Sequence, residues 1–301
     1  MRKTGLALLV GILLFLLWYF FVKHGEYQVN FTTGTTPGDI IQTVRIWNRS
    51  LRDATILSVD SLKGLTQEIE KDGQKYIFEW SFKDADNSKT KTSIVISEPG
   101  HGFLNKLLVP FSEPPIEKTA NKLSHDIYNV IKEHLEITDV EIVGMAEFES
   151  KFCVCTSLET DQSGKAYGMM KDYGLLTSFI ADHGIEVSDK PIVDVTSWDH
   201  NEGSLTFDFC FPVVKTDSLP SSELVNYKTI QGFKAVKAVY KGNYITSDRA
   251  WYELQVYAQQ HDLAIAGFPK EVFYNNPNLG VDEEKWRAEI FIPIKEKPTE
   301  E

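Results

Sequence analysis

The 301-residue chain has little cysteine and no surplus of positive charge, and these shortages exclude several classes of protein. Lys and Arg total 31 against 43 Asp and Glu, which gives a formal net charge of −12. Nucleic-acid binding depends on a basic surface that neutralises phosphates, so we expect no DNA or RNA partner. Cys153, Cys155 and Cys210 are odd in number and lack metal-ligand spacing, so we expect buried free thiols rather than a disulfide framework.

Motifs of the common catalytic and cofactor sites are also missing from the sequence. There is no G-x-S-x-G, no H-E-x-x-H, no G-x-G-x-x-G and no phosphate-binding P-loop. We therefore expect no cofactor and no metal site, and no motif indicates a catalytic residue. Large-scale disorder is not expected either, because 42% of the residues are hydrophobic and 25% are charged.

The longest apolar run lies at the N-terminus. The segment from Gly5 to Val22 contains no charged residue and is just long enough to cross a bilayer as a helix. Bulky side chains at positions 18–21 do not fit a signal-peptide cleavage site, so we expect an uncleaved single-pass anchor over residues 1–25. Arg2 and Lys3 precede the run, and the positive-inside rule then predicts that the soluble part lies on the extracytoplasmic side.

The C-terminal half contains an internal repeat. His183 and Pro191 recur as His261 and Pro269, eight positions apart in each copy. Each copy reads as an apolar strand, an amphipathic helix and two further strands. The pattern predicts two strand–helix–strand–strand units of one origin, within an overall α+β fold.

The last strand of each copy carries one acidic residue on its less apolar face. Asp208 and Glu289 each stand four residues before a proline, and alternate positions around them form an apolar face. We place the two repeats at about 139–216 and 226–296. If both helices cover the same side of a joined antiparallel sheet, the two carboxylates should line a cleft on the opposite side.

Three stretches of this half resemble the bacterial GyrI-like small-molecule-binding family, which also forms the effector-binding domain of AraC-type and multidrug-sensing regulators. They are VYKGNY (Val239 to Tyr244), GFPKEVFYNNP (Gly267 to Pro277) and RAEIFIPI (Arg287 to Ile294). The resemblance assigns residues 138–296 to this domain. It implies a cleft between two matching units, with an acidic residue on the last strand contacting ligands that are often cationic and aromatic.

By this resemblance Glu289 matches the acidic position, and Tyr274 and Tyr244 match aromatic positions. The other candidate ligand-binding residues are Tyr240, Asp208 and Trp198. A carboxylate in a sheltered cleft attracts a cation more strongly than in water, and aromatic faces add on the order of 1 to 2 kcal/mol. Some family members hydrolyse small reactive compounds, so Glu289 and Tyr274 could instead be catalytic; a purely structural ion pair at Glu289 is the remaining alternative.

Residues 26–137 show a different pattern. A short strand and a helix from about Pro37 to Leu51 precede two alternating strands, Tyr76 to Phe82 and Lys89 to Glu98. A long amphipathic helix follows Pro114-Pro115. This order resembles a shortened START-like, polyketide-cyclase-type (SRPBCC) helix-grip fold, which would act as a scaffold between the membrane and the second domain. We expect residues 297–301 to be a disordered tail.

Together these patterns predict a membrane-anchored protein that sequesters or senses a small amphipathic or cationic compound in the cleft of a GyrI-like domain. A hydrolase that uses Glu289 and a tyrosine is the first alternative, and a protein that docks partners at the membrane surface is the second. The binding hypothesis predicts that Glu289→Gln weakens the binding of cationic dyes at least tenfold, equivalent to about 1.4 kcal/mol or more.

Overall fold

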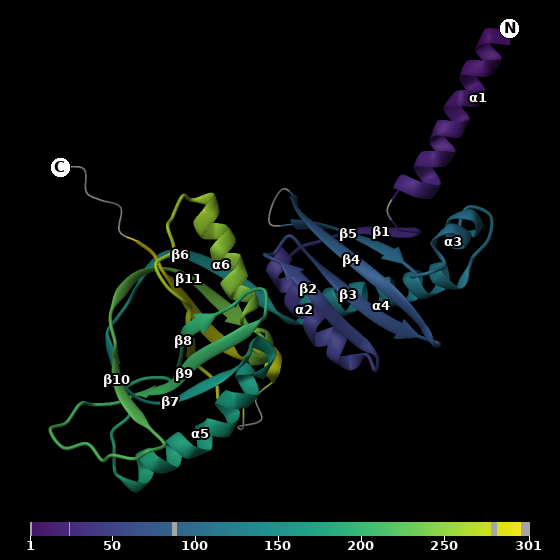
Figure 1. Ribbon diagram of the computed structural model, residues 1–301. Coiled ribbons are helices and arrows are strands. Elements are labelled where there is room, and N and C mark those ends of the chain that lie inside the picture. Colours follow the sequence, from purple (N-terminus) through teal and green to yellow (C-terminus); the bar gives the residue numbers. More distant parts are fainter. Residues whose placement is uncertain (1, 24, 86–88, 278–281, 296–301) are drawn as a thin grey trace, which may run out of the picture.

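The computed structural model describes residues 2–23, 25–85, 89–277 and 282–295, and it contains an N-terminal helix followed by two antiparallel sheets (Figure 1). Helices cover one face of each sheet, which confirms the α+β class expected from the sequence. The expected tail over 297–301 lies outside the described residues.

The N-terminal helix, α1 (Arg2–Leu17), continues through a short π-helical segment, Trp18–Val22, and extends away from the rest of the chain (Figure 1). Its apolar part spans Thr4–Val22, 19 residues with a mean hydropathy of 2.6, and no part of this span is buried. It is the one helix in the described part of the chain that is long and apolar enough to cross a membrane.

The first sheet has five strands in the order β1-β5-β4-β3-β2. Its strands are β1 (Tyr27–Thr33), β2 (Ala54–Asp60), β3 (Gly64–Lys71), β4 (Gln74–Ala85) and β5 (Lys89–Ser97). The predicted hairpin is formed by β4 and β5, and residues 86–88 of its turn lie outside the described residues.

Two helices cover this sheet: α2 (Pro37–Ser50) and α4 (Pro115–Ile137). The start of α2 is set by Pro37 in its first turn and by the Thr36 hydroxyl, which accepts the backbone N–H of Asp39. The apolar stripes of both helices are buried, at Ile40 and Ile41 on α2 and at Ile127 on α4. Both helices predicted here are thus observed, while assignment to the helix-grip fold stays a prediction.

The second sheet has eight strands in the order β10-β7-β9-β8-β12-β13-β11-β6. Its strands are β6 (Asp139–Phe148), β7 (Lys151–Asp161), β8 (Ile192–Trp198), β9 (Ser204–Pro212), β10 (Asn226–Ile230), β11 (Phe233–Lys241), β12 (Lys270–Phe273) and β13 (Arg287–Pro293). Helix α5 (Lys165–Asp182) follows β7 and helix α6 (Arg249–Gln260) follows β11, so the predicted order of strand, helix, strand, strand occurs twice.

The two copies share details beyond their order of elements. The Nδ1 atoms of His183 and His261 each lie 2.9 Å from the carbonyl oxygen four residues earlier, where α5 and α6 end. Asp248 directly precedes α6, but its side chain makes no capping bond and instead accepts a hydrogen bond from Gln162.

Each copy pairs its first strand with the other copy, and this exchange of two strands curls the sheet. Strand β6 pairs with β11, and β10 pairs with β7, although β6–β7 and β10–β11 are joined by only two residues each. The two edges of the sheet must therefore meet at this end. The face opposite α5 and α6, here called the inner face, is filled near this junction by buried side chains. They are Phe148, Cys153, Cys155, Ile192, Cys210, Ile230, Ala235 and Phe291.

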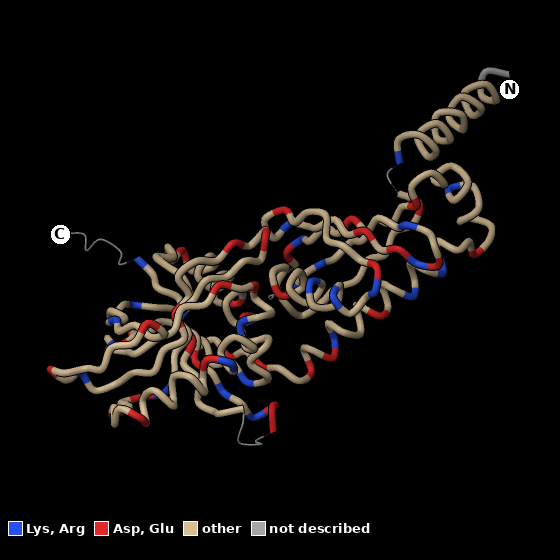
Figure 2. The backbone as a smooth tube through the Cα atoms, turned by 60° about the horizontal axis from the view of Figure 1, so that its bottom comes forward, with Lys and Arg blue, Asp and Glu red and all other residues tan. Residues whose placement is uncertain are grey.

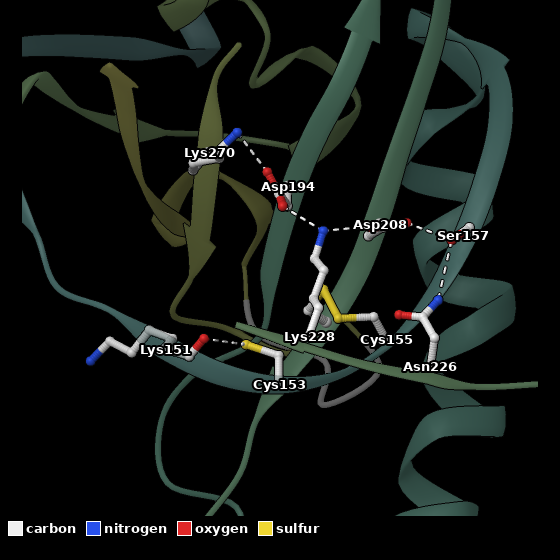
Figure 3. The surroundings of a disulfide bond; sticks show 10 residues. Lys151, Cys153, Cys155, Ser157, Asp194, Asp208, Asn226, Lys228 and Lys270 are labelled. Atoms are coloured by element: carbon white, nitrogen blue, oxygen red, sulfur yellow. Dashed lines mark hydrogen bonds and ion pairs between the residues drawn. A yellow bond between two sulfur atoms is a disulfide. The ribbon is translucent and has the colours of Figure 1, made fainter. Parts of the chain in front are cut away.

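This packed inner face corrects two expectations. The inner face is not an open cleft near the junction, because its own side chains fill it. Cys155 and Cys210 are not free thiols: they face each other across β7 and β9, with Cα atoms 4.1 Å apart, and form a disulfide (Figure 3). Their pairing depends on strand register, which residue counting does not supply. Cys153 is free and buried.

The two sheet units contact each other through α2 and α6. A Cβ atom at Gly38 would lie 2.1 Å from the ring of Tyr252, so only glycine allows this approach. Beside it, the buried Asp39 lies 3.2 Å from His134 and 3.8 Å from Arg249 of α6. The contact between the two units thus includes buried polar and charged side chains as well as ring packing.

Candidate functional site

A cavity of about 610 Å³ opens on the helix side of the second sheet. It lies between α5 and the segment that follows β12, with the short 3₁₀ helix Tyr244–Thr246 beside it. Ala166 and Met169 line it from α5, and Pro191 and Phe209 contribute further apolar surface. A volume of this size is typical of sites for small organic ligands.

Aromatic side chains form one wall of the cavity. The ring of Tyr244 lies 4.6 Å from Phe273 and 5.2 Å from Trp286, measured between ring centroids. Tyr173 of α5 lines the cavity from another direction. Such rings offer flat apolar faces to an aromatic ligand and attract a cation that approaches them.

The hydroxyl of Tyr244 is fixed by the backbone. It donates to the carbonyl of Arg287 at 2.9 Å and accepts the N–H of Asn275 at 3.1 Å. Burial raises the pKa of Tyr244 to about 12, although these backbone hydrogen bonds lower it in part. The residue therefore stays protonated at physiological pH, and its hydroxyl hydrogen is already donated to the Arg287 carbonyl.

The cavity lining also includes polar side chains, namely asparagines and two carboxylates. Asn276 donates to the hydroxyl of Tyr173 at 3.0 Å, and Asn243 donates to Glu283 at 2.6 Å. Asp282 also lines the cavity and, like Glu283, is exposed. The cavity thus combines an apolar interior with two accessible carboxylates.

Directly behind this lining is a buried ion pair that sequence analysis missed. Lys165 of α5 and Glu271 of β12 are both 0% exposed, and the lysine Nζ lies 2.9 and 2.8 Å from the two carboxylate oxygens. Ser247 and the indole N–H of Trp251 also donate to Glu271. The sequence held one signal: strand alternation puts Glu271 on the same face as Phe273, so a charge shares a face with a large apolar side chain.

Glu289 and Tyr274, the proposed catalytic alternative, lie together on the inner face. Glu289 is 9% exposed and pairs with Lys237 at 2.9 Å and with Arg287. The Arg287 guanidinium lies 4.1 Å from the ring centroid of Tyr274. Burial raises the pKa of Glu289, but its hydrogen bond to Lys237 and its other partners outweigh burial and hold the pKa below its ordinary value. The carboxylate is therefore ionised and a weak base.

Asp208 belongs to a separate ionic network on the inner face, shown in Figure 3. Lys228 of β10 bridges Asp208 and Asp194, and Lys270 lies 2.6 Å from Asp194. Burial lowers the pKa of Lys228, but its hydrogen bonds to the two aspartates outweigh that effect and raise it. Two lysines thus compensate two aspartates, and Asp208 carries no spare charge toward a ligand.

The six predicted ligand-binding residues therefore do not form one site. Tyr244 lines the cavity. Tyr240 is fully buried, and its hydroxyl donates to the carbonyl of Asn243. Trp198 is packed 5.0 Å from Trp251 and lies outside the cavity lining.

Within residues 2–23, 25–85, 89–277 and 282–295, no group of three or more His, Cys, Asp or Glu side chains could hold a metal ion. The cavity itself offers aromatic contact, hydrogen bonding and two surface carboxylates. These groups suit reversible binding of an amphipathic molecule.

Comparison with known proteins identifies this half of the chain. The profile of the GyrI-like small molecule binding domain matches residues 156–295, which confirms the resemblance seen in the sequence. No curated protein matches the chain. Whether residues 26–137 form a domain of the expected START-like type, and the domain boundaries themselves, stay predictions.

Several solved structures match part of this chain at low identity. The EcmrR–DNA complex is 15% identical with a TM-score of 0.45, and the match covers 60% of this chain and 65% of that chain, less than two thirds of its length. The EcmrR C-terminal domain is 14% identical (TM-score 0.45; 53% of this chain and 99% of that one). SAV2435 bound to tetraphenylphosphonium is 14% identical (TM-score 0.38; 52% and 94%).

Proposed function

Because residues 156–295 form a GyrI-like small-molecule-binding domain, we propose that the cavity beside α5 binds a small amphipathic compound with a flat aromatic body. The protein would hold this domain at a membrane surface, where it sequesters or senses the compound. The observation that carries the proposal is the apolar cavity of about 610 Å³ walled by Tyr244, Phe273 and Trp286.

The charges around the cavity indicate how a ligand would be oriented. Glu271 lies behind the lining and is neutralised by Lys165, so it offers no net charge to a ligand. Asp282 and Glu283 are the accessible carboxylates of the lining. A cationic ligand would therefore place its apolar body inside and its charged group against Asp282 and Glu283.

The membrane anchor and its orientation are supported by two features. The span Thr4–Val22 is fully unburied, unlike the core helix of a soluble protein. The disulfide between Cys155 and Cys210 fits an oxidising compartment, because cytosolic thiols are kept reduced. We therefore propose that the helix is a single-pass anchor and that both sheet units face the extracytoplasmic side. A net charge of −12 does not favour a nucleic-acid partner.

A cavity-filling substitution tests the binding site. Met170 lines the cavity and is half exposed, so Met170→Trp should fill the cavity without disturbing the core. We expect it to abolish saturable binding of a cationic rhodamine, measured by dye anisotropy with the full chain in nanodiscs and empty nanodiscs as the blank. A neutral coumarin of similar size serves as the second probe and should bind the wild-type cavity through its apolar body.

The matched control is Tyr167→Trp, which adds the same side chain on the exposed side of α5, outside the cavity lining. This variant should bind both dyes as the wild type does. Equal binding by all three proteins would mean that the dyes do not use this cavity. Rhodamine binding without coumarin binding would mean that charge, rather than the aromatic wall, dominates recognition.

The hydrolase alternative uses Glu289 and Tyr274, the two residues that the family resemblance named as a catalytic pair. Their side chains contact each other in the structure. A general base works best with a pKa near the operating pH, whereas the pKa of Glu289 is lowered. Product formation from activated esters that is abolished by Glu289→Gln would favour the hydrolase over the binding protein.

A further inference from the structure

A cluster of apolar side chains is exposed on α3 (Gly102–Leu108) and the residues after it. They are Phe103, Leu104, Leu107, Leu108 and Phe111. Phe111 is 85% exposed, the highest exposure of any large hydrophobic side chain described. Large apolar side chains gathered in this way mark a surface that is covered in the working protein.

This apolar segment is attached to the end of the N-terminal helix. The Lys106 ammonium donates to the carbonyl of Phe20 at 3.3 Å and to that of Lys23 at 2.5 Å. The hydroxyl of Tyr19 donates to the carbonyl of Lys106 at 2.9 Å, and the rings of Phe20 and Phe103 lie 4.9 Å apart. These bonds hold α3 against the last turn of the apolar span.

The position of α3 matches the boundary of a bilayer crossed by α1. In Figure 1 α3 lies level with the lower end of the N-terminal helix, while both sheets extend away from that end. The second view, in Figure 2, shows the same arrangement and a helix with no charged residue between its ends. A bilayer around Thr4–Val22 would therefore reach α3 before any strand.

We propose that residues 102–111 insert into the interfacial layer of the bilayer as a second membrane contact beside the anchor. This inference rests on the proposed anchor. Lys106 is the only charged residue of the segment GFLNKLLVPF, and its ammonium is bound to carbonyl groups of the anchor helix. Insertion therefore depends on apolar burial rather than on attraction to anionic lipids. The contact fixes the tilt of the first sheet unit relative to the membrane.

Depth-dependent fluorescence quenching of the full chain in phosphatidylcholine vesicles tests this contact. A single NBD label is placed through Phe111→Cys, through Leu13→Cys inside the span, or through Tyr167→Cys on exposed α5. The labelled wild type is the blank, because Cys153 is buried and the other two cysteines form the disulfide. Spin-labelled lipids with the quencher near the headgroup or deep in the chain report depth.

We expect the Phe111 label to emit at shorter wavelength than the Tyr167 label and to be quenched most by the shallow spin label. The Leu13 label should be quenched most by the deep spin label.

Adding anionic phosphatidylglycerol should leave the Phe111 signal unchanged; a signal that requires anionic lipid would overturn the apolar mechanism. A Phe111 label that behaves like Tyr167 while Leu13 is quenched would refute the contact and leave the anchor intact. Absence of quenching at Leu13 would refute the anchor, and the contact with it.

Discussion

Both faces of the eight-stranded sheet pair their acidic residues with basic side chains, but the two faces differ in how much unfilled volume they contain. On the helix side Glu271 is neutralised by Lys165 behind an aromatic cavity. On the inner face Glu289 and Asp208 are paired with lysines and an arginine, and apolar side chains and a disulfide fill the junction. A buried carboxylate is therefore a poor guide to a ligand site in this fold. Our proposal instead follows the unfilled apolar volume beside α5.

The reason lies in the cost of removing charges from water. An unpaired buried carboxylate costs several kcal/mol, so a folded chain supplies a partner unless a ligand does. Here the chain supplies Lys165 to Glu271, Lys237 to Glu289 and Lys228 to Asp208. Apolar surface needs no partner and can remain open until a ligand covers it.

Breaking the ion pair behind the cavity should have the largest effect on stability. Lys165→Met leaves Glu271 charged and without its cation at a site that is 0% exposed, and we expect a loss of about 3 to 5 kcal/mol in unfolding free energy. Urea denaturation followed by circular dichroism measures this loss. The double variant Lys165→Met/Glu271→Gln removes both charges and should recover much of it. Equal instability of the single and double variants would show that packing, not charge, is responsible.

Reducing the disulfide tests how much the crosslink on the inner face stabilises the fold. The bond joins residues 55 positions apart, and a crosslink of this kind contributes about 2 to 4 kcal/mol. Dithiothreitol should therefore lower the melting temperature of the wild type. Cys153→Ala keeps the disulfide and should retain this sensitivity, whereas Cys155→Ser/Cys210→Ser should lose it. Burial raises the pKa of the Cys153 thiol to about 12, so exchange with the disulfide is not expected.

The pH dependence of the unfolding free energy should show how much burying the Asp248 carboxylate beside α6 destabilises the protein. Burial raises the pKa of Asp248 to about 7. The folded chain keeps a proton that the unfolded chain releases between about pH 4 and 7, so unfolding free energy falls as pH rises through this window. Asp248→Asn should remove on the order of 2 kcal/mol of this dependence and make the protein more stable than the wild type at pH 8.

Asp217→Asn on the surface is the control for this pH experiment and should leave the curve unchanged. Denaturation at pH 5, 6.5 and 8 gives the comparison. Parallel curves for the wild type and Asp248→Asn would show that Asp248 does not titrate in this range.

Local patterns predicted much of the fold. The apolar span, the two helices over the first sheet, the hairpin of β4 and β5 and the duplicated unit follow from periodicity, proline placement and an internal repeat. These signals depend on neighbours within one element, which the sequence displays directly.

The site was less predictable because it depends on which strands are neighbours. Alternation placed Glu289 and Arg287 on the same face of β13, but the partner Lys237 depends on the pairing of β11 with β13. The closure of the inner face depends on the exchange of β6 and β10. The disulfide likewise needed the register of β7 against β9. Tyr244 was found through its motif, whereas the cavity beside it depends on how α5 packs, which no local pattern encodes.

The smallest expected effect separates the two faces most directly. If the ligand occupies the cavity beside α5, Glu289→Gln should change rhodamine affinity by less than about twofold, or 0.4 kcal/mol, because Glu289 lies on the inner face and outside the cavity lining. Asp282→Asn/Glu283→Gln should weaken the cationic dye more than the neutral coumarin, since exposed carboxylates contribute up to about 1 kcal/mol. Anisotropy titrations of both variants decide the question. A tenfold loss in Glu289→Gln, with the Asp282/Glu283 variant unaffected, would move the ligand to the inner face and return Glu289 and Tyr274 to the centre of the site.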